Sequence, residues 1–118
     1  MKALKWIGKS REDLMEFPDE VIDEVGHGLY LAQMGERYTH AKPLSGFGSA
    51  KILEIRENDR SGTYRVVYTV EMPEFIFVLH AFQKKSKSGI KTPKQDIDMI
   101  KRRLKETESL YKELKGKK

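Results

Sequence analysis

The strongest constraint on the fold is an almost uninterrupted apolar stretch in the second half of the chain. Residues 75–82 are apolar at every position except His80. A stretch of this length is far too short to span a membrane, and it is typical of a central strand covered on both faces. We therefore expect a sheet in which this strand lies inside, with other elements packed over it.

Two further stretches predict the neighbours of this strand. Residues 51–57 and 63–70 are rich in β-branched and aromatic residues, and the polar residues 58–62 form a turn between them. Residues 71–74 form a second short turn before the apolar strand. Because short turns join antiparallel strands, we predict a three-stranded antiparallel meander.

The N-terminal part predicts two helices. Ser10 begins a segment that resembles a capping box, and Pro18 is suited to the first turn of a second, amphipathic helix of about 14–16 residues. Gly35 is a plausible end for that helix. We expect a loop over residues 35–50, and residues 1–9 could pair as an edge strand.

A third helix is predicted at the C-terminal end, over residues 92–114. Thr92 fits the N-cap and Pro93 fits the first helical position. The expected fold class is therefore α+β, with two N-terminal helices, an antiparallel sheet of three to four strands and a C-terminal helix that closes one edge. Residues 1–118 should form one domain, with the last few residues frayed.

Composition excludes several classes of protein. The chain contains no cysteine, so disulfides and thiolate metal sites are excluded. It has no apolar run long enough for a membrane span, and its first residues lack the apolar run of a signal peptide. We expect a cytoplasmic protein.

The positive charge is concentrated in the last third of the chain. Residues 84–118 hold 13 Lys and Arg against 5 Asp and Glu, whereas residues 1–83 have a net charge of −3. Such asymmetry suggests a nucleic acid as partner. A solvated helix face with a lysine-rich tail would give the same count.

Strand alternation groups three charged residues. Tyr64, Val66, Tyr68 and Val70 should face the core, which turns Arg65 to the opposite face. Glu54 and Arg56 share one face of the neighbouring strand, so Arg56 and Arg65 are predicted to lie on one surface with Glu54 beside them. An arginine fork can bind phosphate oxygens bidentately, but a cross-strand salt bridge explains the same pattern.

The segment that follows the apolar strand combines an aromatic residue with lysines. Aromatic rings stack on single-stranded bases, and lysines neutralise the phosphate backbone. Because phenylalanine is usually buried, the sequence favours a place in the core for Phe82 over a stacking role. The basic residues in question are Lys84, Lys85, Lys87 and Lys91.

Histidines offer one candidate for proton transfer. His80 alternates with Val78 and Phe82 and could act as an acid or base near neutral pH, or it could be a buried structural histidine. His27 and His40 have no partner at metal-ligand spacing, so we predict no metal site.

Several segments, in order over residues 40–105, resemble the phage-derived branch of the RelE/HigB toxin superfamily. The part from His80 to Pro93 is the most specific. The matching segments are Lys42–Leu44, Gly46–Gly48, Glu54–Arg56, Gly62–Tyr68, Val78–Ser86 and Thr92–Pro93.

The resemblance implies a toxin of a type II toxin–antitoxin pair that cuts mRNA, mostly on the ribosome, without a metal or other cofactor. In such cleavage the 2′-hydroxyl attacks the adjacent phosphate, and cations stabilise the developing charge. Arg65 matches the arginine of the family that contacts the scissile phosphate. Lys84 and Lys85 match its basic residues after the strand, and Arg56 is a second phosphate contact.

The resemblance also implies partners and leaves one role open. The partners are a helix-turn-helix antitoxin, mRNA and the ribosome, with Lys51, Phe82, Lys87 and Lys91 as further RNA contacts. Some members use a C-terminal Tyr or His in acid–base chemistry, whereas this tail offers only Tyr111. Glu54 and His80 are possible substitutes. The alternative is a non-catalytic phage- or plasmid-derived relative that binds nucleic acid or only its antitoxin.

Overall fold

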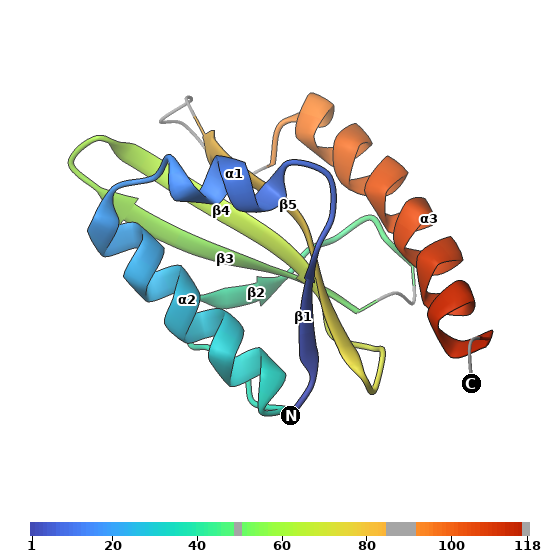
Figure 1. The fold of residues 1–118 in the computed structure, drawn as a ribbon. Helices are drawn as coiled ribbons and strands as arrows, with labels where there is room; N and C mark the ends of the chain where they lie inside the picture. Colours follow the sequence, from blue (N-terminus) through green and yellow to red (C-terminus); the bar gives the residue numbers. More distant parts are fainter. Residues whose placement is uncertain (49–50, 85–91, 117–118) are drawn as a thin grey trace.

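The computed structural model describes residues 1–48, 51–84 and 92–116, which form one five-stranded sheet and three helices (Figure 1). The strand order across the sheet is β1-β5-β4-β3-β2. In chain order the elements are β1 (Ala3–Trp6), α1 (Ser10–Met15), α2 (Asp19–Gln33), β2 (Ala41–Pro43), β3 (Ile52–Asp59), β4 (Gly62–Thr69), β5 (Phe75–Lys84) and α3 (Lys94–Gly116).

The predicted meander forms the centre of the sheet. Strands β3, β4 and β5 pair antiparallel in sequence order, and β1 adds to β5 in parallel as an edge strand. The other edge strand is β2, which pairs with β3. Strand β2 lies within residues 35–50, where a loop is expected from the sequence. The sheet thus has five strands rather than three to four, because a three-residue strand is too short to show an alternating pattern.

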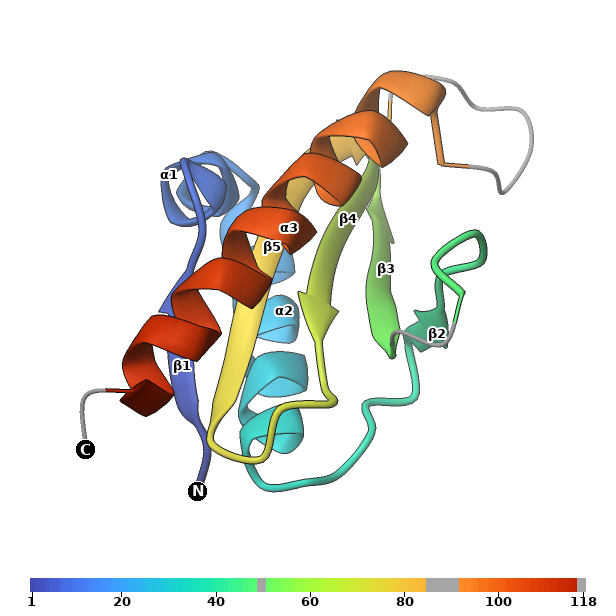
Figure 2. The same cartoon turned by 90° about the vertical axis from the view of Figure 1, so that its right-hand side faces the viewer.

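The two faces of the sheet carry different layers. Helices α1 and α2 cover one face, where Tyr64, Val66 and Tyr68 are buried as predicted. Helix α3 runs across the opposite face (Figure 2), where Ile100 is buried with Val67 of β4. The prediction that this helix closes one edge is wrong, because its apolar residues pack on the side chains of β5 that point away from α2.

The bounds of α2 follow the expected signals, whereas the predicted caps of α1 and α3 do not form. Helix α3 begins at Lys94, after Pro93, and the Thr92 hydroxyl donates to Glu54 instead of capping the helix. Pro18 precedes α2, and the backbone N–H of Gly35 donates to the Ala32 carbonyl with Gly35 at a φ of +83°, so glycine ends this helix as predicted. Ser10 does not cap α1. It is fully buried, and its hydroxyl donates to the carbonyl of Val78 in β5.

Strand β5 contains one irregularity. Val67 pairs with His80 and Tyr68 pairs with Val78, so Leu79 has no partner in the register of β4. This extra residue is a β-bulge, and it changes which side chains share a face. His80 and Phe82 lie on the α3 side, whereas Val78 lies on the α2 side with Ala81, contrary to the simple alternation expected for these residues.

No helix among the described residues combines the length and the apolar character needed to cross a membrane.

Candidate nucleic-acid interface

A buried carboxylate organises the α3 side of the sheet. Glu54 of β3 is fully buried, and its Oε1 accepts hydrogen bonds from Arg56 Nε at 2.9 Å and Arg65 Nη1 at 2.8 Å. Arg56 and Arg65 are directly opposite each other in the β3–β4 register. The predicted grouping of these three residues is confirmed, and Glu54 offsets the repulsion between two arginines at paired positions.

The segment before α3 completes the coordination of this carboxylate. The Thr92 hydroxyl donates to Glu54 Oε2 at 2.8 Å across 38 positions of sequence. Both oxygens of Glu54 are therefore occupied by donors, and its side chain has no exposed surface. In this arrangement Glu54 holds the arginines in place and is not open to take a proton from a substrate.

Lys84 ends β5 beside this cluster. It lies opposite Thr63, two residues before Arg65 on β4, and it is only 5% exposed. Burial lowers the pKa of Lys84, and the nearby positive charge of Arg65 lowers that pKa further. Lys84 therefore loses its proton and becomes a neutral amine more readily than a solvated lysine does.

The arginines differ in accessibility. The side chain of Arg56 is 30% exposed, whereas that of Arg65 is 4% exposed. Arg56 is therefore the more accessible cation in this structure, and Arg65 lies beneath the surface, held by Glu54. Guanidinium groups fixed in this way are preorganised donors for an oxyanion, because their orientation does not have to be set when the anion binds.

His80 adjoins the cluster on the same face, but its ring nitrogens are engaged. Nε2 lies 2.8 Å from Asp96 Oδ1 in the first turn of α3, and Arg103 Nη1 approaches Nδ1 at 3.4 Å. The ring stacks on Phe82, with centroids 4.7 Å apart. Phe82 is itself opposite Arg65 in the register and partly buried against the α3-side core. This geometry favours the structural interpretation of His80 over a proton-transfer role.

The structure brings most of the predicted site residues together and separates one. Six of them lie on the α3 side near the start of that helix: Glu54, Arg56, Arg65, His80, Phe82 and Lys84.

Lys51 lies apart from this group. It precedes β3 by one residue, which places it five residues and about 17 Å along the strand from Arg56. There it lines a groove of about 590 Å³ with Lys2 and Arg37. Lys85, Lys87 and Lys91 are outside the described residues, so their predicted contacts stay predictions.

Three further residues contact the cluster or His80 beside it, although the sequence did not identify them as site residues: Thr92, Asp96 and Arg103. Thr92 was assigned to capping, whereas Asp96 and Arg103 look like ordinary polar positions of a helix. The spacing of Asp96 and Arg103 by seven residues places them on the same side of α3. A spacing of seven residues is common among surface residues of helices, so it does not predict that Asp96 and Arg103 contact β5.

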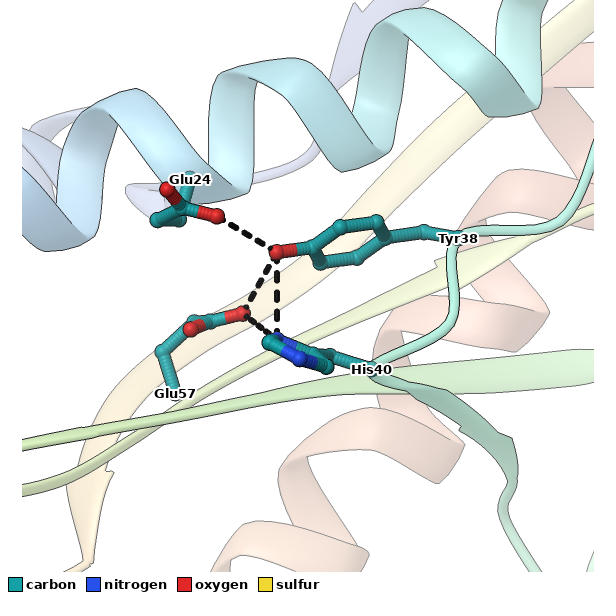
Figure 3. Close-up of polar contacts among 4 residues, drawn as sticks. All are labelled: Glu24, Tyr38, His40 and Glu57. Carbon is teal, nitrogen blue, oxygen red and sulfur yellow. Dashed lines mark hydrogen bonds and ion pairs between the residues drawn. The ribbon is translucent and has the colours of Figure 1, made fainter.

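A second polar cluster lies on the opposite side of the sheet (Figure 3). The Tyr38 hydroxyl is 2.7 Å from Glu24 Oε2 of α2 and 2.9 Å from Glu57 Oε1 of β3, and His40 Nδ1 is 2.5 Å from the same Glu57 oxygen. Burial, followed by the hydrogen bond to Glu24, raises the pKa of Tyr38 far above its ordinary value. Two carboxylates make this region unfavourable for a phosphate backbone, and the cluster ties α2 to the sheet.

Within residues 1–48, 51–84 and 92–116, no group of three or more His, Asp or Glu side chains is placed to hold a metal ion.

The chain is thus a small α+β protein whose sheet carries Arg56 and Arg65 at paired positions on the side covered by α3. Residues 12–105 match the family described as phage-derived protein Gp49-like (DUF891), and the chain belongs to this family. Comparison with curated proteins finds no match.

A solved structure supports the fold. The isolated RelE toxin of E. coli is similar over 86% of this chain and 98% of that chain, with 16% sequence identity and a TM-score of 0.52. This likeness shows a RelE-like fold, as the sequence resemblance implied.

Proposed function

We propose that the protein is a toxin of a type II toxin–antitoxin system, and that it cleaves mRNA without a metal, on the ribosome, to inhibit translation. The observation that carries this proposal is the arrangement of Arg56, Arg65 and Lys84 around the buried Glu54 in a Gp49-like chain with a RelE-like fold. Cations fixed on a sheet face suit a reaction in which negative charge develops on a phosphate.

The reaction needs no external nucleophile, because RNA carries its own. The 2′-oxygen forms a bond to phosphorus and loses its proton, and the bond from phosphorus to the 5′-oxygen breaks as that oxygen gains a proton. The products are a 2′,3′-cyclic phosphate and a 5′-hydroxyl. Arg65, with Arg56 beside it, would stabilise the dianionic phosphorane.

Lys84 is the candidate for proton transfer because of its place at the end of β5 near Arg65 and its lowered pKa. Both oxygens of Glu54 accept hydrogen bonds, and both nitrogens of His80 are engaged. Lys84 has a lowered pKa, so it exchanges its proton more readily than an ordinary lysine near neutral pH. We assign proton transfer to Lys84 and a positioning role to Glu54.

The partner that follows from this activity is an antitoxin with a helix-turn-helix domain. A free nuclease of this kind would harm its host, so the antitoxin should cover the cationic face with an acidic or groove-filling segment. If the purified complex degraded RNA as fast as the free protein, this masking would be excluded.

The alternative is a non-catalytic protein of the same fold that binds nucleic acid or only its antitoxin. One observation favours it: Arg65 is 4% exposed and its Nη1 is paired with Glu54. A guanidinium that stays in this position could stabilise the sheet without touching a substrate.

Inducible expression with RNA-end mapping distinguishes the two. We expect wild-type protein to arrest growth and to generate 5′-hydroxyl ends in mRNA, and the purified protein to cleave in the presence of EDTA. Arg65→Ala should fold and lose about 100- to 1,000-fold in rate, as when an oxyanion donor is removed. Arg11→Ala, which removes an exposed arginine from α1, is the matched control. Unchanged cleavage by folded Arg65→Ala would exclude Arg65 as a catalytic residue.

A further inference from the structure

A β-bulge in β5 determines which residues of that strand face the candidate site. Val78 and Ala81 both belong to the core under α2, although they are three residues apart. In a regular strand, residues at odd spacing point to opposite faces. The bulge at Leu79 removes this conflict, because its extra residue shifts the alternation of everything that follows.

The shift decides which side chains lie beside Arg65. After the bulge, His80 is opposite Val67, Phe82 is opposite Arg65 and Lys84 is opposite Thr63. Without it, His80, Phe82 and Lys84 would be turned to the other face, towards α1 and α2. The bulge is therefore a requirement for the site and not a local defect.

One residue of α3 holds the bulge. Arg103 Nη1 donates to the Leu79 carbonyl at 2.9 Å, which satisfies the acceptor of the residue that has no partner in the ladder. The guanidinium lies against Gly8 in the turn between β1 and α1, where a Cβ would come within 3.0 Å of the guanidinium carbon. Gly8 also has a φ of +56°, which favours glycine.

A second residue of α3 fixes the orientation of the first ring after the bulge. Asp96 Oδ1 accepts a hydrogen bond from His80 Nε2 at 2.8 Å, and the His80 ring is only 20° from parallel with that of Phe82. The contacts thus run from α3 through His80 to Phe82, which faces Arg65 across the ladder.

We propose that Arg103 and Asp96 are positioning residues that maintain the bulge and the His80–Phe82 stack, and thereby place Phe82 and Lys84 on the RNA-binding face. This proposal rests on the proposed function for the identity of the ligand. Its geometric part stands on the contacts alone.

The test uses the full chain and variants matched in position and charge. Arg103→Met removes the donor to Leu79, and Arg102→Met removes the same charge from the adjacent, exposed position of α3. Asp96→Ala removes the acceptor for His80, and Asp98→Ala removes an exposed carboxylate whose contact is a bond to Lys94. Arg103→Lys tests rescue, because an ammonium can still donate to a carbonyl. Circular dichroism establishes that each variant is folded.

Two readouts separate positioning from general stability. Stacking on Phe82 shifts the His80 Cε1–H proton signal, and we expect Arg103→Met and Asp96→Ala to move it towards the value of free histidine, while both controls leave it in place. In a translation extract, cleavage of mRNA should fall about 10- to 100-fold in Arg103→Met relative to Arg102→Met. Binding of a short 2′-O-methyl RNA, which cannot be cleaved, should weaken in parallel, and Arg103→Lys should recover part of both.

The outcomes are distinct. If folded Arg103→Met and Asp96→Ala keep the wild-type His80 signal, or if they cleave and bind RNA as their controls do, the positioning role is wrong even where the wild type is an active nuclease. If wild-type protein binds the 2′-O-methyl RNA without ever cleaving RNA, the nuclease function fails. In that case the same shifts in the His80 signal and in affinity still support positioning.

Discussion

Removal of the charge on Glu54 is the perturbation for which the structure predicts the largest effect. Glu54→Gln keeps the shape of the side chain but leaves the paired guanidinium groups of Arg56 and Arg65 without their shared carboxylate. The site has no exposed surface at Glu54, so water cannot replace the lost charge. We expect the sheet to be destabilised, although no apolar contact is removed.

The magnitude follows from three contributions. Breaking a buried ion pair by removing one partner costs about 3–5 kcal/mol. Glutamine retains one carbonyl acceptor, which keeps part of one hydrogen bond, and Arg56 is partly solvated. Both effects place the expected loss at the lower end, about 3 kcal/mol in the free energy of unfolding. For a domain of this size that corresponds to roughly 10 °C in melting temperature.

Urea unfolding followed by circular dichroism measures this loss, with Glu71→Gln as a control that removes an exposed carboxylate from the β4–β5 turn. A double-mutant cycle with Arg65→Met should show that the two losses are far from additive, because each single change leaves the partner buried. A Glu54→Gln variant within about 0.5 kcal/mol of the wild type would refute the argument that Glu54 holds the two arginines.

Three further predictions follow from buried groups and local geometry. No described residue hydrogen-bonds the buried hydroxyl of Tyr68, so Tyr68→Phe should be more stable by about 1 kcal/mol at pH 7 in urea unfolding. Burial raises the pKa of Tyr68 to about 12, so the unfolded chain loses this proton first and the wild type loses stability as the pH rises from about 10; Tyr68→Phe should lack this part of the alkaline loss. Gly28→Ala should cost about 1–3 kcal/mol, since a Cβ would lie 2.7 Å from the Tyr38 ring, whereas Gly26→Ala, with open space around it, should gain about 0.5–1 kcal/mol. Lys84→Ala should lower the rate of RNA cleavage by a factor that does not depend on salt, because Lys84 is assigned to proton transfer; recovery of the rate at low salt would show instead that Lys84 acts through its charge.

The core of the fold could be predicted because its signals are local and periodic. Strands β3 to β5 alternate or are apolar throughout, and their turns are short enough to leave only antiparallel pairing. Helix α2 shows a helical period and is followed by Gly35, which has a positive φ, so its bounds could also be predicted from the sequence. The grouping of Glu54, Arg56 and Arg65 followed from alternation on two paired strands.

The rest depended on contacts between distant parts of the chain. Strand β2 has three residues and exists because β3 offers it an edge. The bulge at Leu79 inserts one residue into an apolar strand whose composition shows no break, and it is stabilised by Arg103, 24 positions away. A pattern that treats β5 as regular therefore assigns Val78 and His80 to the same face, and only tertiary contacts show that they are on opposite faces.

Charge composition and the structure direct attention to different cations. The basic excess lies in residues 84–118, yet most cations of α3, such as Lys101, Arg102 and Lys105, are exposed on the outer side of that helix. Arg56 and Arg65 come from the first 83 residues, whose net charge is negative. The two sets act over different ranges, because exposed charges are screened beyond about 10 Å at moderate salt, whereas buried charges are screened much less. The α3 cations would therefore speed an encounter with a polyanion, whereas under the proposed function the contact with phosphate falls to Arg56 and Arg65, which net charge does not reveal.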